Sequence, residues 1–305
     1  MPKIFTPFSL RRKRELLLIG FFLSPSLLVL FVYRILPLFW NFVLSFLYWA
    51  PARPAKFAGL AHYEEMFFYD EVFREALFNT VVYMGSMPLA IAVALLIALA
   101  VNSQIRGRNI YRTITFLSYP MMPVAVAIIW QWLYNEKVGL FNYLLRAAGI
   151  ISHPFSFLES VTFALPSVIV AGMWQILGFY MIILLTGLQS IPQSLYEAAA
   201  IDGAGGLQKF FHITLPLLRP SIFLCMVIAV ISSFTSFDLV YVMTGGGPGH
   251  ATELLVTYIY KKAFGLTEFD YAAALTVVMF LLFLGITIVV NRFSGGEVGK
   301  VDVTL

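Results

Sequence analysis

Residues 197–220 read EAAAIDGAGGLQKFFHITLPLLRP, a long polar-containing interruption between apolar stretches. Ser194 followed by Glu197 matches a capping box, with serine as N-cap and glutamate three residues on, and the alanines that follow favour a short helix. Gly203 stands where a left-handed helix end requires glycine. A second short helix is expected after it, ended or kinked by the prolines of the segment. Its apolar residues are expected to form one stripe: Leu207, Phe210, Phe211, Leu217 and Leu218.

These local features leave two interpretations open. The segment is either an ordinary polar connector with a capped helix, as many membrane proteins have, or a surface built to meet another protein. Capping boxes and glycine stops are common at helix ends, so the segment alone does not decide between the two.

The composition of the whole chain points to a membrane protein. Of its 305 residues, 60% are hydrophobic and 12% are charged, and the mean hydropathy is +0.86. Soluble domains carry roughly 25% charged residues. The single cysteine, Cys225, rules out a disulfide framework. The four histidines are scattered through the sequence, so no metal site is predicted.

Six apolar stretches predict an all-α membrane domain with six spans. A basic N-terminus, residues 1–15, precedes the first span, which is too long for the apolar core of a signal peptide. The expected spans cover about 16–36, 78–101, 113–134, 161–189, 221–243 and 271–291. A short amphipathic helix is expected at 70–77, before the second span. We therefore expect a domain at 16–291 that includes a cytoplasmic loop at 190–220, followed by a cytoplasmic tail at 292–305.

The distribution of charge predicts the orientation in the membrane. Twelve lysines and arginines lie in the N-terminus, the 102–112 loop, the central loop and the tail, against seven in the opposite connections. Basic residues gather on the cytoplasmic side, so both termini and the central loop are expected in the cytoplasm of a multi-pass membrane protein. The net charge of +4 then reflects topology, and no nucleic-acid partner is expected.

No catalytic constellation is found in the sequence. There is no GxxxxGK[ST] segment, so this chain has no ATP cradle. The GGGPG run at 245–249 has no lysine after it and no strand before it, and it is read as a turn. No Ser/His/Asp set or carboxylate pair converges on one place, so the chain is not expected to be an enzyme.

Polar residues within the spans are candidates for a solute path, because such residues are costly in a bilayer and usually face an interior or a wet cavity. Aromatic faces beside hydroxyl and amide groups would suit a sugar. The alternative is that these residues glue helices together or mark the membrane interface. The candidates are Asn79, Gln131, Trp174, Gln175, Tyr180, Ser233, Ser236 and Asp238.

The central segment resembles the EAA loop of permease subunits of binding-protein-dependent ABC importers. That pattern has Glu-Ala-Ala, a glycine four residues later, an isoleucine ten further on and then Leu-Pro. Here it is met by Glu197, Ala198, Ala199, Gly203, Ile213, Leu215 and Pro216, and Asp202 and Pro220 fit the version of the carbohydrate transporters.

A second stretch, residues 237–264, is similar to the fifth span and external loop of carbohydrate permeases of the maltose-uptake type. Residues 37–46 and the six-span layout extend the resemblance more weakly. Some relatives have extra N-terminal spans and a large external domain, and this chain has neither.

The resemblance implies a type I ABC importer permease that takes up a sugar or sugar-like solute. It implies four kinds of partner: a second homologous permease, two ATP-binding subunits that hold ATP and Mg²⁺, an external solute-binding protein, and membrane lipid. No cofactor is expected on this chain. The residues expected to couple to the ATPase are Glu197, Ala198, Ala199, Asp202, Gly203, Phe210, Phe211, Leu215 and Pro216.

Three alternatives remain open at this point. An ion-coupled secondary transporter would use Asp238 as its coupling carboxylate. A purely structural membrane protein would need neither the central loop nor polar residues at depth. Within the importer class, an amino acid or glycerol phosphate would be a different substrate, although a phosphate would favour basic residues on the path.

Overall fold

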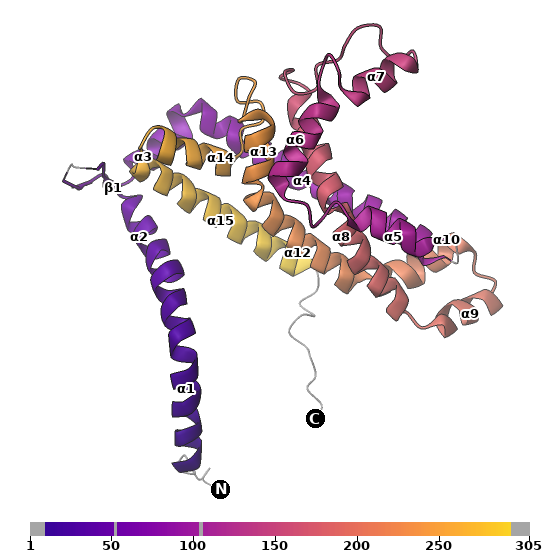
Figure 1. Ribbon diagram of the computed structural model, residues 1–305. Coiled ribbons are helices and arrows are strands. Elements are labelled where there is room, and N and C mark those ends of the chain that lie inside the picture. Colours follow the sequence, from indigo (N-terminus) through magenta and orange to yellow (C-terminus); the bar gives the residue numbers. More distant parts are fainter. Residues whose placement is uncertain (1–9, 52–53, 104–105, 294–305) are drawn as a thin grey trace.

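The computed structural model describes residues 10–51, 54–103 and 106–293, and most of this chain is helical (Figure 1). Four helical stretches are long and apolar enough to cross a membrane, and a fifth qualifies as a bent pair. They are Glu15–Leu44, Glu71–Asn102, Ala164–Ser190, Phe269–Arg292, and Gly206–Leu217 with Arg219–Thr235. This agrees with the predicted all-α membrane fold. Most of the predicted N-terminal segment and tail, residues 1–9 and 294–305, lies outside the described residues.

The first span stands apart from the rest of the molecule. It consists of α1 (Leu10–Leu30), a π-helical turn at Phe31–Ile35 and α2 (Leu36–Leu44), and it extends beyond the predicted end at residue 36. Figure 1 shows α1 running away from the other helices, and only the α2 end meets α15.

A small external unit follows α2. It contains a two-stranded antiparallel hairpin, β1 (Leu47–Tyr48) and β2 (Lys56–Phe57), then α3 (Ala61–Glu64) and a π-helical turn at Glu65–Tyr69. The amide of Trp49 donates to a carboxylate oxygen of Asp270 (2.9 Å), and Tyr63 donates to the Ser45 hydroxyl (2.8 Å). The first bond holds the unit against the start of α15, and the second joins α3 to the end of α2.

The second span, α4 (Glu71–Asn102), is one continuous helix. The prediction of a separate amphipathic helix at 70–77 is therefore wrong. Asp70 is the N-cap and accepts from the Phe73 amide (2.9 Å), so the helix begins directly after it. α4 packs along α8 (Ala164–Ser190), the fourth span, and together they carry much of the buried apolar core.

The third predicted span, 113–134, is divided into two helices, α5 (Arg108–Phe116) and α6 (Pro123–Tyr134). The six-residue break between them contains Pro120 and ends at Pro123. Proline removes a backbone donor and clashes with the preceding turn. After α6, the short helix α7 (Leu140–Ala147) lies in an arm at the top of the molecule (Figure 1).

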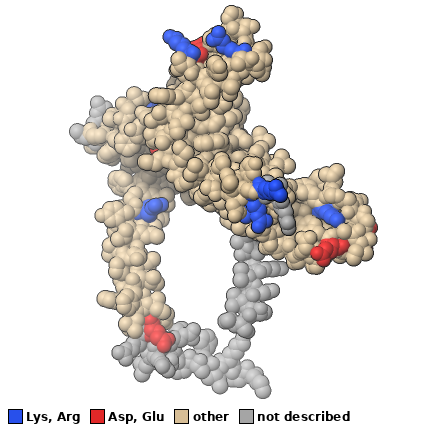
Figure 2. Space-filling view, turned by 45° about the vertical axis from the view of Figure 1, so that its right-hand side comes forward, with Lys and Arg blue, Asp and Glu red and all other residues tan. Residues whose placement is uncertain are grey.

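The fifth predicted span is also divided, into α12 (Arg219–Thr235) and α13 (Phe237–Thr244), which meet at Ser236. The next loop leads to α14 (Leu255–Tyr260), a π-helical turn at Lys261–Gly265 and α15 (Phe269–Phe293). A second apolar cluster joins α4, α14 and α15 at the outer end. Figure 2 shows few charged side chains on the visible face: they lie at the top, at the right-hand end, on the N-terminal helix and, as a blue group, on the body of the molecule beside a grey patch.

Candidate functional site

A cavity of about 400 Å³, with largely apolar walls and several polar side chains, lies where the two divided spans meet α4 and α8. The breaks at 117–122 and at Ser236 interrupt the helical surface there. The cavity is lined by Tyr83, Met87, Tyr119, Met121, Pro123, Gly172, Gln175, Ile176, Ser232, Thr235, Ser236, Asp238 and Leu239. We call it the inner cavity.

Side chains of α8 and of the break fix the backbone around the inner cavity. Gln175 donates to the Met121 carbonyl (3.1 Å), and the Ser118 hydroxyl donates to the Trp174 carbonyl (3.1 Å). The Gln175 bond gives a partner to a carbonyl of the break, and the Ser118 bond ties the break to α8. Polar groups at membrane depth need such partners within the protein. The break is thus held by long-range contacts as well as created by proline.

Three predicted path residues line the inner cavity: Gln175, Ser236 and Asp238. Ser236 donates to the Ser232 carbonyl (2.7 Å). Asp238 is exposed and has no ion pair with another described residue. Its carboxylate is therefore available to a solute.

The other five path candidates have different positions. Asn79 donates to two carbonyls of the external loop, and Gln131 bonds to the end of α13. Trp174 packs edge to face on Trp130, with ring centroids 5.7 Å apart. The remaining two are buried: Ser233 donates to the Ala229 carbonyl, and Tyr180 is enclosed completely. None of these five lines the inner cavity.

Sequence reasoning missed two tyrosines of this cavity, Tyr83 and Tyr119. Tyr83 lies four residues after Asn79 and four before Met87, and all three share the buried face of α4. The four-residue spacing from Asn79 could therefore have identified Tyr83 as a residue of the same helix face. Tyr119 lies in the break, where helical periodicity gives no guide.

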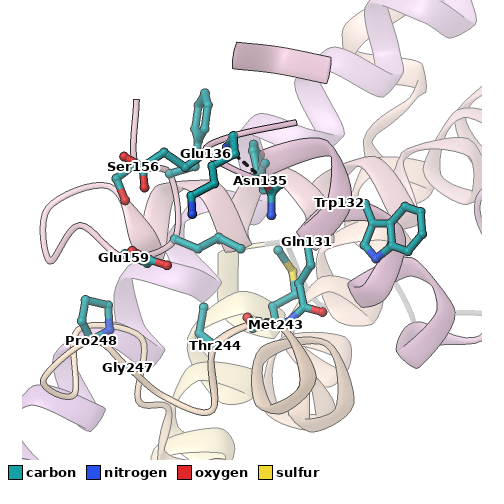
Figure 3. A pocket seen from close by; sticks show the side chains of 14 residues that line it. Gln131, Trp132, Asn135, Glu136, Ser156, Glu159, Met243, Thr244, Gly247 and Pro248 are labelled. Carbon is teal, nitrogen blue, oxygen red and sulfur yellow. Dashed lines mark hydrogen bonds between the residues drawn. The ribbon is translucent and has the colours of Figure 1, made fainter. Parts of the chain in front are cut away.

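A second, outer pocket of about 670 Å³ lies between the arm after α6 and the loop after α13 (Figure 3). The two cavities are placed in series, because α6 and α13 pack together and each borders both. On α6, Pro123 lines the inner cavity and Gln131 the outer pocket, a separation of about 12 Å along the helix. Gln131 ties the pair, donating to the carbonyls of Val242 (2.8 Å) and Met243 (3.0 Å).

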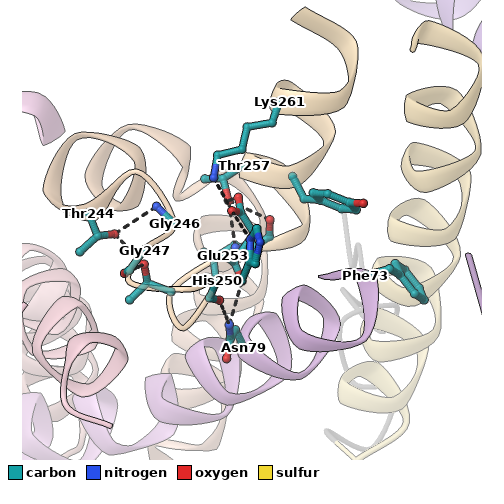
Figure 4. A network of polar contacts seen from close by, with 12 residues as sticks. Phe73, Asn79, Thr244, Gly246, Gly247, His250, Glu253, Thr257 and Lys261 are labelled. Carbon is teal, nitrogen blue, oxygen red and sulfur yellow. Dashed lines mark hydrogen bonds and ion pairs between the residues drawn. The ribbon is translucent and has the colours of Figure 1, made fainter. Parts of the chain in front are cut away.

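The glycine loop after α13 is held by a buried carboxylate (Figure 4). Glu253 is 0% exposed, accepts from the Thr257 hydroxyl (2.7 Å) and forms an ion pair with Lys261. Asn79 of α4 donates to the carbonyls of His250 (3.0 Å) and Glu253 (3.1 Å). The turn predicted at 244–250 is therefore present, and it is anchored to α4.

Gly246 is required by this arrangement for two reasons. Its φ of +88° lies in the region that favours glycine. A Cβ there would lie 2.7 Å from Glu253 Cδ and 2.8 Å from Lys261 Nζ. A side chain at this position would therefore meet the ion pair directly.

The central loop is a projecting pair of helices, α9 (Gln193–Ile201) and α10 (Gly206–Lys209), at the far end of α8 (Figure 1). Gly203 has a φ of +79°, as predicted. The amides of Gly203 and Ala204 donate back to the carbonyls of Ala200 (3.1 Å) and Ala199 (2.8 Å), which closes the end of α9.

Two predictions for this loop are wrong. Ser194 is not the N-cap: α9 starts after Pro192, which occupies that place without a side-chain bond. Proline has a fixed φ and no amide donor, so the helix begins immediately behind it. The single apolar stripe is also wrong, because Leu218 is buried whereas Leu207 and Phe211 are exposed.

The predicted coupling residues fall into two groups. Glu197, Ala198, Asp202, Gly203 and Phe211 are exposed on the loop, while Ala199, Phe210, Leu215 and Pro216 are half-buried against its inner side. The Tyr196 and Thr214 hydroxyls, 2.9 Å apart, join α9 to the following π-helical turn, Phe210–Thr214. Near Leu218 the chain bends by 62° into α12. The prolines of the segment stand at the starts of α11 (Leu215–Leu217) and α12, as the predicted kink requires.

The predicted coupling residues did not include two exposed apolar residues of the loop. Ile201 is 88% exposed and Leu207 is 77% exposed. They flank the glycine turn on either side. Their apolar character in a polar connector was the available signal.

Three features are typical of a membrane transport component: broken spans, a cavity between them that carries polar side chains, and a projecting helical loop. The chain belongs to the family described as binding-protein-dependent transport system inner membrane component, which matches residues 90–295. It is thus a permease of the ABC importer class.

The relatives span nearly the whole chain. It is 36% identical to the probable ABC transporter permease protein YurN of Bacillus subtilis (strain 168), over 89% of this chain and 94% of the relative. It is 33% identical to the trehalose/maltose transport system permease protein MalF of Thermococcus litoralis, over 88% and 92%. A solved bacterial ABC transporter involved in the import of the acidic polysaccharide alginate has a similar chain, with a TM-score of 0.78, 26% identity and coverage of 92% and 96%.

Proposed function

We propose that this chain is the membrane subunit of an ATP-driven importer for a sugar or sugar-like solute, with ATP hydrolysis supplied by separate subunits. The observation that carries the proposal is the projecting α9–α10 loop with its exposed Ile201 and Leu207. Apolar side chains exposed on a protruding polar loop mark a protein interaction site. ATP and Mg²⁺ would be held by the partners that dock there.

Movement of the loop would reach the solute path along α12. This helix starts at the 62° bend beside the loop and ends at Ser236 in the inner cavity. A docked ATP-binding subunit that shifts α9 and α10 would move the near end of a rigid helix whose far end carries Ser232 and Ser236. This is a physical route for alternating access.

A second permease subunit would complete the path. The apolar window of the first span is 0% buried within this chain, against 33% for α4 and 44% for α8. Figure 1 shows α1 standing away from the other helices. We propose that a homologous subunit occupies part of this space and that lipid covers the remainder. The solute would then pass between the two subunits.

The outer face would receive an external solute-binding protein. Three segments next to membrane spans lie at the end opposite to α9 and α10: the hairpin, the α7 arm and the glycine loop (Figure 1). Because lysine and arginine are in excess on the α9–α10 side, we propose that both termini and the coupling loop lie in the cytoplasm.

The substrate class follows from the lining of the inner cavity. Tyrosines, hydroxyls, an amide and one carboxylate surround it, and no lysine or arginine does. Hydroxyls of a sugar would find donors and acceptors there, and its ring faces would pack against aromatic side chains. The names of the relatives include both a trehalose/maltose permease and sn-glycerol-3-phosphate permeases of similar identity, 33–34%. The lack of lysine and arginine among the lining residues favours the sugar over the phosphate. Nothing in the family supports the ion-coupled alternative at Asp238.

The test is a pull-down of the tagged chain from detergent-solubilised native membranes. The wild-type chain is expected to bring down an ATP-binding subunit and a second permease. Ile201→Asp and Gly203→Asp should lose the ATP-binding subunit and keep the permease. Leu266→Asp, at an exposed apolar position of the opposite end, is the matched control and should keep both. A wild-type chain that comes down alone, or loop variants that retain the ATP-binding subunit, would refute the proposal.

A further inference from the structure

The outer pocket is a built cavity whose two walls are fixed before anything binds. One wall is the arm after α6: the Asn142 side chain donates to the Phe155 carbonyl (2.9 Å) and accepts from the Phe155 amide (2.7 Å). The other wall is the glycine loop, in which Thr252 donates to the Gly247 carbonyl (2.8 Å) and approaches Thr244 (2.6 Å). Glu253 anchors that loop from behind, so the pocket is preorganised.

The two carboxylates in this pocket are free to bind. Glu136 and Glu159 line it, and neither has an ion pair or a side-chain hydrogen bond with another described residue. Glu159 stands on one side, across from Thr244 and Pro248 of the loop (Figure 3). Carboxylates accept hydrogen bonds from hydroxyl groups, and such charge-assisted bonds are strong.

The floor of the pocket is aromatic. Tyr134 and Phe157 both line it and stack on each other, with ring centroids 4.8 Å apart. The Tyr134 hydroxyl donates to the Ser167 carbonyl (3.2 Å), which fixes the ring. Apolar ring faces next to carboxylate and amide groups match a molecule with apolar C–H faces and a rim of hydroxyls.

The charge of the lining excludes one class of solute. Two carboxylates and one ammonium, that of Lys137, leave the pocket negative. Anionic solutes are disfavoured there, since like charges repel. The volume of about 670 Å³ lies within the roughly 300–1,000 Å³ range of small-molecule sites. A sugar of one or two rings fits these limits.

We propose that the outer pocket is a separate reception site for a neutral polyhydroxylated solute, with Glu136 and Glu159 as its hydroxyl acceptors. It lies outside the inner cavity on the α6–α13 pair and would hold the solute before the path opens. The inference rests on the proposed import function, because it supplies the step that precedes passage through the inner cavity.

The experiment measures binding to the full chain in lipid nanodiscs by saturation-transfer difference NMR. Maltose and mannitol are the neutral probes, and glucuronate is the anionic probe. The wild-type chain should give signals with the neutral probes and none with glucuronate. Loss of both acceptors in the E136A/E159A double variant should weaken the apparent affinity about tenfold, as expected for the loss of two hydrogen bonds.

Two controls separate binding from general damage. The E64A/E65A double variant removes two exposed carboxylates of the outer face and should bind like the wild type. The E136Q/E159Q variant keeps one acceptor oxygen at each position without the charge, so its affinity should lie between those of the wild type and the E136A/E159A variant. Absence of signal with both neutral probes, or equal affinity in the E136A/E159A variant, would overturn the proposal. Since no ATP-binding subunit takes part, this result is independent of the pull-down that tests the import function.

Discussion

The buried ion pair of the external loop gives a prediction whose size can be worked out. Breaking a buried pair costs about 3–5 kcal/mol, because one charge is left without its partner. Lys261 is 35% exposed while Glu253 is 0% exposed, so water can recover part of the loss, and we expect about 2–3 kcal/mol for Glu253→Gln. At roughly 2–4 °C per kcal/mol for a chain of this size, the Tm should fall by about 5–10 °C.

A matched pair lies close by in the chain. Lys262 and Glu268 form a salt bridge at 2.7 Å, but Glu268 is 46% exposed. Exposed pairs contribute about 0–1 kcal/mol, so Glu268→Gln should lower the Tm by less than about 3 °C.

Cys225 offers the assay for both variants. It is the only cysteine and is buried, so a thiol-reactive fluorophore reports unfolding of the detergent-solubilised chain during heating. Equal shifts for Glu253→Gln and Glu268→Gln, or no shift for Glu253→Gln, would refute the reasoning.

Two further predictions use the same thermal assay. Burial alone would raise the pKa of Asp70, but hydrogen bonds from Tyr258 (2.6 Å), Tyr271 (2.5 Å) and the Phe73 amide outweigh it and lower the pKa below its usual value. The ionised Asp70 therefore stabilises the fold above the ordinary aspartate pKa, and this contribution is lost as pH falls through the lowered pKa. Asp70→Asn should lower the Tm at pH 7 and have a smaller effect toward acid pH. A shift in Tm that does not depend on pH would contradict this role of Asp70. At Gly178, a Cβ would lie 2.6 Å from the Phe116 backbone, so Gly178→Ala should cost about 1–3 kcal/mol of stability. The control is Gly285→Ala, where a Cβ would have no atom within 4 Å; it should be neutral or stabilising, as alanine usually is in a helix. Similar Tm values for the two variants would show that α5 and α8 do not pack closely.

The sequence allowed the class of fold and the central loop to be predicted, because both depend on local features. Apolar length identifies spans, and Gly203 identifies a left-handed helix end. The N-cap predicted at Ser194 is wrong because Pro192 occupies that place, and α9 begins directly after it without a side-chain cap. The fixed φ of proline and its missing amide donor suit the position before a helix.

The broken spans show what local sequence could not determine. Pro25 and Pro88 lie inside helices, whereas Pro120 lies in a break. Every proline removes one backbone donor, so its presence alone does not decide the outcome. The break at 117–122 is held by Gln175 and Ser118, whose bonds join segments more than fifty residues apart.

The same limit applies to the polar candidates. Asn79 and Gln131 looked like path residues because amides are costly in a bilayer. Both donate to carbonyls at the end of α13 or in the loop after it, and Gln131 also lines the outer pocket. A polar residue at depth needs a partner, and the sequence does not tell whether that partner is a solute or the backbone.

The most direct test of the central claim is a photo-crosslink from the coupling loop in native membranes. Benzoylphenylalanine replaces Ile201, which is exposed on α9, and in a control chain it replaces Leu144, which is exposed on the α7 arm at the opposite end. The account predicts that the adduct of residue 201 contains a protein with a GxxxxGK[ST] nucleotide-binding segment, and that residue 144 captures no such protein. An adduct of residue 201 without a nucleotide-binding partner, or the same ATP-binding protein captured from both positions, would contradict the claim that this loop couples the permease to ATP hydrolysis.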